Sequence, residues 1–530
     1  MRQEQNAIEY GRLSNSLVFI SAALIGCVLS LMCFLVVRSH FLYLIDAGYI
    51  MQQISMHAEY GRKLYEQIEF PYGPFLFYGP IVLAALLSPL HISSTAVYYL
   101  ALVIEHVTGL LLAAYILDRL PMLRKWKTLL FLLCAVATFP MNLGLNYTLL
   151  RFVLSPACLI FACRKTQPWT VAMCFFLGQM ISLSVSPEMA LAFGAASVAY
   201  ATFLCYTKGW AWVIAASAPL VATFVFFLLI NRNYLLMLKS FALGAFNFIV
   251  EPLPHILIFL FALVWLVPCG LAFFFRQRRP DAPMVAALYI FSLALLPVAF
   301  GRADPGHVLF DGLMIFFLSM GAISALGRRQ QGAWAILVTA FFLWSTYVNV
   351  LGSKFEWKPA LSEGVLGYQA TGMRNAALTF IRTGSLTQAE QMIVHIPPDD
   401  HSFDIGQLTA IIGRSPVVVP FTLPLYAEEE IKAAGLLTPS YYCSLIGVLD
   451  AGGEQREIDE FNTSQWALLP EKLIARWTET PDNTKFAMGI QLTYPEKHPP
   501  YIIGERFNEN LAVHWQPVSK IGIYEVYRRR

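Results

Sequence analysis

The sequence predicts a polytopic α-helical membrane protein that ends in a soluble α/β domain. Of the 530 residues, 57% are hydrophobic and only 13% are charged, and the mean hydropathy of +0.57 is high for a soluble globular protein. Long uncharged apolar runs recur as far as about residue 351, and polar, proline-containing sequence follows. We therefore expect a transmembrane domain at 1–351 and a second domain at 352–530.

The first apolar run, 16–37, carries no charge over 22 residues. It is longer than the apolar part of a signal peptide and lacks a small-residue cleavage signal, so we interpret it as an uncleaved first span. Further spans are predicted at 94–117, 128–141, 147–163, 170–185, 189–206, 210–230, 255–275, 283–300, 308–326 and 332–351.

The apolar segment 75–90 follows one Tyr-Gly-Pro triplet, at 72–74, and contains a second, at 78–80. If 75–90 does not cross the membrane, most basic residues of the connecting loops fall on the side of the amino terminus, as the positive-inside rule requires. These residues are Arg119, Arg124, Lys125, Lys127, Arg164, Lys165, Lys208, Arg276, Arg278, Arg279, Arg328 and Arg329. We therefore predict about eleven spans plus a juxtamembrane helix at 75–90 that lies on the outer face.

This topology places the amino terminus in the cytoplasm and the carboxyl-terminal domain outside it, and we expect a bacterial inner (plasma) membrane. In that domain, strand-like runs at 392–396, 417–421 and 444–449 alternate with helix-like segments at 366–383 and 426–436. The alternation is typical of one mixed α/β domain. Cys443 is the only cysteine there, so an internal disulfide is excluded. The net charge of +3 gives no support for nucleic-acid binding.

Polar residues that stand next to apolar spans collect on the predicted outer side. Charges in such places need partners or a polar cavity, although interfacial charges often only cap helices or reach toward lipid headgroups. Their convergence on one face is therefore the stronger argument for a functional site. The residues are Asp46 and Glu59 in the first outer loop, Arg151 near a span end, Glu188 at a turn, and Arg302, Asp304 and His307 in a later loop. Glu105 and His106 lie within a span, and we expect them to pair inside the bundle.

The order of these elements resembles the GT-C fold glycosyltransferases, the superfamily of protein mannosyltransferases and aminoarabinose transferases. Asp46 soon after the first span, the stretch GRKLY at 61–65 and the turn PYGPFLFYGP at 71–80 are similar to their first outer loop. Ser-Pro-Glu at 186–188 and the Arg-x-Asp-x-x-His loop at 302–307 are similar to later elements. The resemblance extends over about 1–351.

The resemblance implies an integral membrane glycosyltransferase, of hexosyl or pentosyl type, that uses a polyprenyl-phosphate-linked sugar donor. The acceptor would be a glycan, lipid or protein hydroxyl on the extracytoplasmic face, and a bound nucleic acid is not expected. Carried over by position, Asp46 is the catalytic base, the donor phosphate is held by Arg302, His307 and Arg151, and the groove is lined by Tyr72, Tyr78 and Asp304. The first outer loop has no Asp-x-Asp, so no metal ligand is predicted and a requirement for Mg²⁺ or Mn²⁺ stays open.

These residue types suit the chemistry. A carboxylate can take the proton of the acceptor hydroxyl as the new bond forms. Cations can hold the negative charge that grows on the departing lipid phosphate. A single base that activates attack from the far face predicts inversion, whereas Glu59 or Glu188, as a second carboxylate, would permit retention.

Two alternatives stay open. A transporter or flippase of lipid-linked sugars would show internal repeats and polar or broken helices near the midplane, and this sequence has no repeat and only Glu105 and His106 deep in a span. The other alternative is a non-catalytic relative whose outer domain binds glycan.

Overall fold

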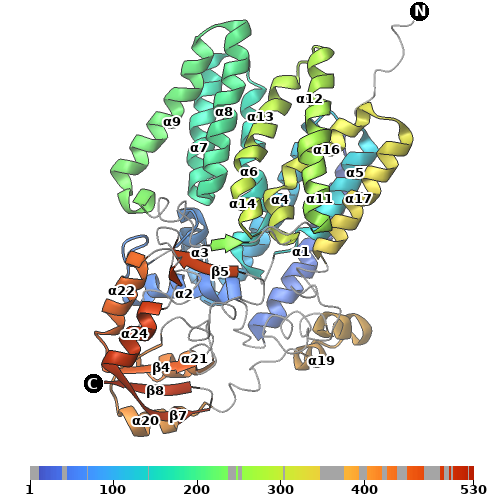
Figure 1. Cartoon of the computed structure of the whole chain (residues 1–530). Helices are drawn as coiled ribbons and strands as arrows, with labels where there is room; N and C mark the ends of the chain where they lie inside the picture. Colours follow the sequence, from blue (N-terminus) through green and yellow to red (C-terminus); the bar gives the residue numbers. More distant parts are fainter. Residues whose placement is uncertain are drawn as a thin grey trace, which may run out of the picture.

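The computed structural model is a bundle of long helices with a smaller domain of helices and strands at one end (Figure 1). The structure describes residues 11–38, 45–68, 70–140, 143–236, 246–248, 253–302, 305–346, 375–392, 403–419, 426–438, 451–470, 490–494, 501–502, 505–522 and 524–530.

Every predicted span coincides with a helix or a broken helix. The helices are α1 (Asn15–Arg38), α4 (Ser94–Arg119), α5 (Arg124–Ala137), α6 (Leu149–Cys163), α7 (Pro168–Val185), α8 (Pro187–Lys208), α9 (Ala211–Ile230), α11 (Pro254–Phe261) continued through the π-helical turn η4 (Ala262–Leu266) into α12 (Val267–Arg276), α13 (Ala282–Ala294) with α14 (Leu296–Arg302), α15 (Pro305–Asp311) with α16 (Leu313–Ala322), and α17 (Arg328–Thr346). Among the described residues, 7 helices are long and apolar enough to cross a membrane, or up to 8 if the bent pair α15–α16 is one span. The predicted polytopic helical fold is therefore confirmed.

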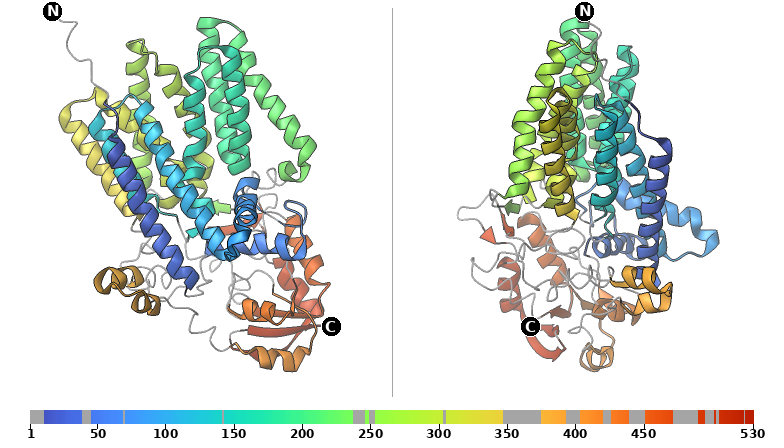
Figure 2. Two further views of the ribbon diagram at one scale, coloured as in Figure 1. Left: turned by 180° about the vertical axis from the view of Figure 1, so that it is seen from behind. Right: turned by 90° about the vertical axis from the view of Figure 1, so that its right-hand side faces the viewer.

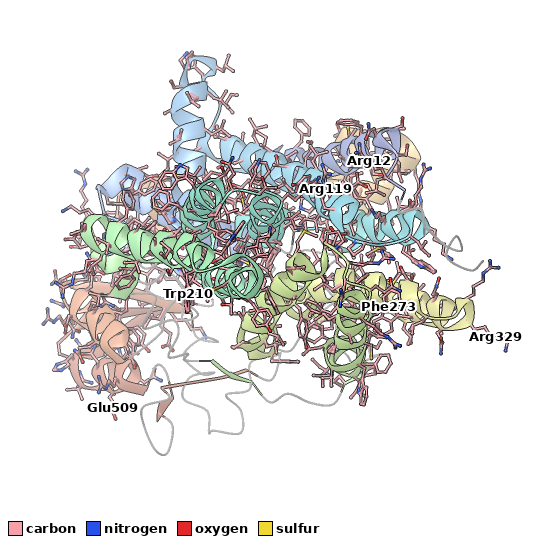
Figure 3. All side chains as sticks on the ribbon, turned by 90° about the horizontal axis from the view of Figure 1, so that it is seen from above. Arg12, Arg119, Trp210, Phe273, Arg329 and Glu509 are labelled. Carbon is pink, nitrogen blue, oxygen red and sulfur yellow. The ribbon has the colours of Figure 1, made fainter. Side chains whose placement is uncertain are left out.

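Successive helices of the bundle run in opposite directions. The Leu13 backbone N–H donates to the Asp118 carboxylate at 2.8 Å, which joins the start of α1 to the end of α4. At the other end of the bundle, the Ser345 hydroxyl near the end of α17 donates to the Pro305 carbonyl at 3.1 Å. We call the end that bears the C-terminal domain the domain face and the opposite end the basic face, where Arg12, Arg119 and Arg329 lie (Figure 3).

Two further helices, α2 (Ile45–Tyr60) and α3 (Pro74–Leu87), lie at the domain face. Helix α3 projects sideways from the bundle (Figure 2). Its side chains Val82 and Leu86 are 56% and 71% exposed, and a helix with apolar side chains outward is stable against a bilayer surface. The predicted juxtamembrane helix is present. However, Gly79 and Pro80 of the second triplet lie inside α3, so only the first triplet forms a turn.

The C-terminal domain contains a five-stranded mixed sheet in the order β3-β2-β4-β8-β7. Its strands are β2 (Val417–Val418), β3 (Leu437–Thr438), β4 (Trp466–Pro470), β7 (Trp515–Ile521) and β8 (Tyr524–Arg529), and its helices include α20 (Ile405–Ile412), α21 (Tyr426–Ala433), α22 (Ala451–Phe461) and α24 (Glu505–His514). The predicted run 417–421 contains β2, and the helix-like segment 426–436 contains α21. The predicted strand 444–449 and all but the first residue of 392–396 lie outside the described residues.

A second, three-stranded sheet joins the two parts of the chain. Strand β1 (Phe246–Phe248), between α9 and α11, pairs antiparallel with β5 (Ile490–Tyr494), and β5 pairs with β6 (Tyr501–Ile502). Figure 1 shows β1 and β5 side by side at the domain face. The membrane part and the C-terminal part are therefore linked by backbone hydrogen bonds.

Candidate functional site

The first Tyr-Gly-Pro triplet attaches the first loop to the end of α7. The Gly73 N–H donates to the Val185 carbonyl at 3.2 Å. A Cβ atom at Gly73 would lie 2.2 Å from the Ser184 carbonyl oxygen, so any side chain is excluded there. Pro74 occupies the first turn of α3, where a missing N–H costs no hydrogen bond. Tyr72 is thereby held beside the junction of α7 and α8.

Arg151, in the first turn of α6, is the centre of a buried polar cluster at this junction. Its Nε donates to the Ser186 hydroxyl at 3.3 Å and its Nη1 to the Asn146 carbonyl at 2.7 Å. Its Nη2 forms an ion pair with the Glu188 carboxylate. The guanidinium also lies 4.8 Å from the centroid of the Tyr72 ring, and the Asn146 amide donates to the Tyr72 hydroxyl at 2.9 Å. We call these five residues the Arg151 cluster.

The ion pair in this cluster is almost fully buried. The Arg151 and Glu188 side chains are each 9% exposed. Glu188 lies in the first turn of α8, where the helix dipole stabilises a carboxylate. Its Oε2 has no hydrogen-bond partner among the described residues. All three guanidinium nitrogens of Arg151 donate to protein atoms, so the cluster holds the ends of α6, α7 and α8 together.

His307 joins the same region from α15. Its Nε2 lies 3.1 Å from the Tyr147 hydroxyl, and the two rings meet edge to face at 5.7 Å between centroids. Tyr147 follows Asn146 in the short helix η3 (Leu145–Tyr147). Asp311, buried at the end of α15, is close enough to interact electrostatically with Arg151. Two predicted phosphate-binding residues, Arg151 and His307, therefore lie in one connected polar region.

The buried pair Glu105 and His106 supports this region from α4. The Thr148 hydroxyl lies 3.1 Å from Glu105 Oε2, and the Leu149 N–H donates to His106 Nδ1 at 3.4 Å. A Cβ atom at Gly109 would lie 2.4 Å from the Leu150 nitrogen, so α4 and the start of α6 are in backbone contact. Glu105 and His106 thus hold the first turn of α6, consistent with the expected role inside the bundle.

Other predicted site residues lie elsewhere or outside the described set. Asp46 is in the first turn of α2 and Arg302 ends α14, but the side chains of both, and Asp304 as a whole, lie outside the described residues. Glu59 is near the opposite end of α2, where it accepts from the Ser55 hydroxyl at 2.8 Å. Tyr78, on α3, meets the His57 ring edge to face at 5.7 Å. Helix α2 itself packs against η3.

Sequence reasoning missed four residues of this region: Asn146, Tyr147, Ser186 and Asp311. Asn146 and Tyr147 are uncharged and common next to spans, so no charge pattern marks them, and Ser186 belongs to the quoted Ser-Pro-Glu motif, in which only Glu188 was given a role. Asp311 is different, because it is a carboxylate inside the predicted span 308–326, and intramembrane charges are functional candidates by default.

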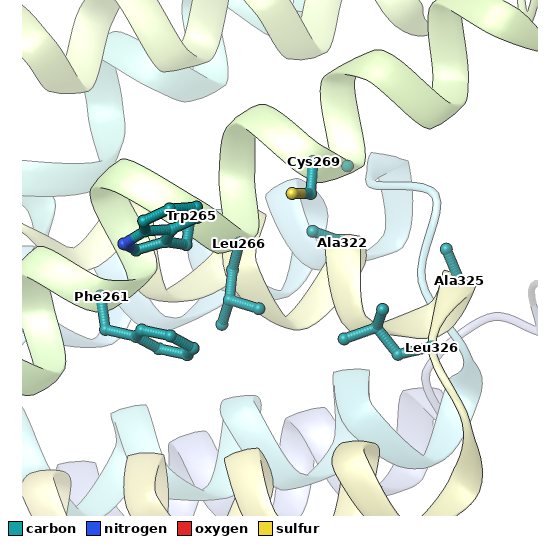
Figure 4. Close-up of a pocket in the computed structure, with 8 residues that line it drawn as sticks. Phe261, Trp265, Leu266, Cys269, Ala322, Ala325 and Leu326 are labelled. Carbon is teal, nitrogen blue, oxygen red and sulfur yellow. The ribbon is translucent and has the colours of Figure 1, made fainter.

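Two hollows lie away from the polar region. One, of about 240 Å³, lies between the α11–α12 segment and α16, and is lined by apolar residues such as Phe261, Trp265 and Leu326 (Figure 4). The other, of about 690 Å³, runs along α9. Neither is lined by an ionisable carboxylate, histidine or arginine, so we locate the candidate site at the Arg151 cluster. Within the described residues, no group of three or more His, Cys, Asp or Glu could hold a metal ion.

Comparison with solved structures finds membrane glycosyltransferases. ArnT from Cupriavidus metallidurans in the apo state has a TM-score of 0.47 at 13% identity, over 94% of this chain and 97% of that chain. The Archaeoglobus fulgidus oligosaccharyltransferase in the apo form has a TM-score of 0.43 at 13% identity, over 87% and 70%. The archaeal oligosaccharyltransferase AglB in complex with an inhibitory peptide and a dolichol-phosphate has a TM-score of 0.39 at 12% identity, over 86% and 69%.

These similar proteins are GT-C fold glycosyltransferases, the superfamily that the first outer loop resembles. No protein-family model matches the sequence, and no curated protein matches it either. Because the identities and TM-scores are low, the function proposed below rests on the residues of this chain.

Proposed function

We propose that this protein is an integral membrane glycosyltransferase that transfers a sugar from a polyprenyl-phosphate-linked donor to an acceptor hydroxyl. The observation that carries the proposal is the Arg151 cluster, which joins Tyr72 of the first loop to the ends of three membrane helices. It lies at the domain face, beside the base of α3. A lipid-borne substrate and a water-borne acceptor can meet only at such a boundary between bilayer and water.

Asp46 is proposed as the base that takes the proton of the acceptor hydroxyl. The helix that carries it, α2, packs against η3, which holds Asn146 and Tyr147. The donor class follows from the resemblance of this loop to that of the GT-C enzymes.

We propose that Arg302 and His307 bind the donor phosphate, where the Arg302 guanidinium and an imidazole N–H of His307 would offset the charge that develops on the leaving group. Arg151 was the third residue predicted from the sequence to bind the donor phosphate. Since its charge is paired with the buried Glu188 and its guanidinium is held by Ser186 and Asn146, we propose that Arg151 maintains the geometry of the site and does not contact the phosphate directly.

The contacts of the other two carboxylates support inversion. Glu188 is paired with Arg151, and Glu59 with Lys432 of the C-terminal domain at 2.9 Å. A carboxylate that a cation already neutralises is a weak nucleophile, and retention requires a second carboxylate that can attack. Asp46 is then the one proposed carboxylate left to act, which makes the reaction a single displacement.

The test is Asp46→Asn in the full-length protein, assayed in membrane vesicles with a radiolabelled polyprenyl-phosphate sugar. We expect transfer to be lost while protein level and membrane insertion are unchanged, because the amide cannot accept the proton. The control is Glu66→Gln, an exposed carboxylate of the same loop that should transfer normally. Full activity of Asp46→Asn would remove Asp46 from the mechanism, and movement of the labelled lipid across sealed vesicles without a new glycosidic bond would instead identify a transporter.

A further inference from the structure

The carboxyl end of α2 is tied to the C-terminal domain by two ion pairs. Glu59 pairs with Lys432 of α21 at 2.9 Å, and the same ammonium group donates to the Ser55 hydroxyl at 2.9 Å. Arg62 pairs with Glu460 of α22. We call Glu59, Arg62, Lys432 and Glu460 the loop–domain interface.

The local fold directs these side chains to the domain. Gly61, at a φ of 66°, ends α2, and the Arg62 N–H bonds back to the Met56 carbonyl at 3.3 Å. The turn sends Arg62 out beside the last turn of the helix, next to Glu59. The Arg62 and Glu460 side chains are only 17% and 23% exposed, so this pair is less screened by solvent than an open surface pair.

The arrangement of charge is complementary and asymmetric. The end of α2 and the turn after it present an acid and then a base, and the domain presents a base and then an acid. A shifted docking would bring like charges together, which is costly at an interface. The pairing of β1 with β5 tethers the same domain to a second loop of the bundle, so the domain is held at two separate loops of the domain face.

Asp46 lies at the other end of α2, about 20 Å from Glu59 along the helix axis at about 1.5 Å per residue. Ala47 and Ile50 of the intervening turns are fully buried, so the helix is packed along its length. A packed helix moves as one body, and a force on one end therefore sets the position of the other.

We propose that the C-terminal domain positions the proposed catalytic helix, with Arg62 and Glu460 as positioning residues. This role rests on the proposed function, because it gives the domain a part in transfer through Asp46. It does not require the domain to touch either substrate.

The experiment measures α2 directly, by hydrogen exchange of the 45–60 peptides in the full-length protein in detergent. Arg62→Glu and Glu460→Arg should each accelerate exchange in α2 by about fivefold, the effect of about 1 kcal/mol for a partly exposed pair. The double variant Arg62→Glu with Glu460→Arg restores the attraction with the charges exchanged and should return exchange to the wild-type rate. Exchange in α4 should not change in any variant.

Lys63→Glu is the matched control. Lys63 pairs at 3.6 Å with Glu66 of its own loop and is 71% exposed, so its reversal alters the loop charge without touching the domain. We expect its exchange rates to equal the wild type. Unchanged α2 exchange in Arg62→Glu and in Glu460→Arg, or equal acceleration by Lys63→Glu, would overturn the proposal.

Transfer from the labelled polyprenyl-phosphate sugar separates this proposal from the proposed function. Misplacement of Asp46 should lower kcat about fivefold in each single variant with little change in KM for the donor, and the double variant should recover kcat. A loss of folded protein would also lower the apparent kcat at an unchanged KM, so kcat is expressed per folded protein, measured as the monodisperse fraction in detergent. If exchange responds as expected but the wild type transfers no sugar, the docking role stands and the proposed function fails.

Discussion

Gly73 lies so close to Ser184 that a Cβ atom on Gly73 would fall 2.2 Å from the Ser184 carbonyl oxygen. Gly73→Ala should therefore push the first loop away from α7 and move Tyr72 from Arg151. The Ser184 carbonyl is a backbone group, so it cannot move aside by a rotamer change. We expect the variant to lose about 1–3 kcal/mol of stability and to lose sugar transfer. Thermal unfolding in detergent checks the first effect and the transfer assay the second.

The second triplet supplies the control for this variant. Gly79 lies inside α3, and the nearest atom to a Cβ there is Phe75 Cζ at 4.0 Å. Gly79→Ala should be tolerated or slightly stabilising, since alanine favours helix over glycine. If the two alanine variants behave alike, the close backbone approach at Gly73 is not what holds the loop.

The Arg151–Glu188 pair predicts a non-additive response. Glu188→Leu or Arg151→Met leaves a buried charge without its partner, which should cost about 3–5 kcal/mol of stability. The double variant Arg151→Met with Glu188→Leu removes both charges and should be more stable than either single variant. Unfolding of the four proteins gives the coupling free energy; additive losses would mean that the pair does not form.

Glu105 predicts a difference between two uncharged replacements. The Thr148 hydroxyl has one hydrogen, and two oxygens lie within reach, Glu105 Oε2 at 3.1 Å and the Leu145 carbonyl at 2.9 Å. Glu105→Gln keeps a hydrogen-bonding group at that position and should unfold at nearly the wild-type temperature. Glu105→Leu removes the group and should cost about 1–3 kcal/mol. Equal losses in both variants would show that the carboxyl charge itself is required.

Helix α3 predicts a labelling pattern. Ser88, exposed at its end, should react as Ser88→Cys with a membrane-impermeant maleimide added to the side of the C-terminal domain, in a Cys443→Ser background. Gln330→Cys, exposed on the basic face, should react only from the other side. Reaction of Ser88→Cys from the basic side alone would mean that 75–90 crosses the membrane.

The sequence was most informative where a property is local. Apolar runs predicted where the helices of the bundle lie, and the exclusion of 75–90 from the spans, which rests on the distribution of arginine and lysine, stays a prediction that the labelling tests. The prediction of a turn at Gly79 and Pro80 was wrong. Proline and glycine usually interrupt a helix, but here both lie inside α3. Strands such as β3 and β6 are two residues long and depend on their neighbours in the sheet, so no periodicity marks them.

The candidate site depends on contacts between residues far apart in the chain, which the sequence does not show. Arg151 and Glu188 were both predicted as site residues, but their mutual pairing follows from the packing of α6 beside α8, which sequence spacing does not contain. The partner Asn146 is neutral and leaves no signal, and Ser186 was quoted only as part of the Ser-Pro-Glu motif. Likewise, the role of Glu59 depends on Lys432, which lies far along the chain.

The pairing of β1 with β5 has a practical consequence for anyone who wishes to produce the soluble part separately. A fragment of 352–530 would lack Phe246–Phe248, and one edge of β5 would then present unpaired N–H and C=O groups to solvent. Open strand edges recruit other strands, so such a fragment should self-associate on purification. Supplying the FNF tripeptide segment in cis, through a short flexible linker, would be the rational remedy.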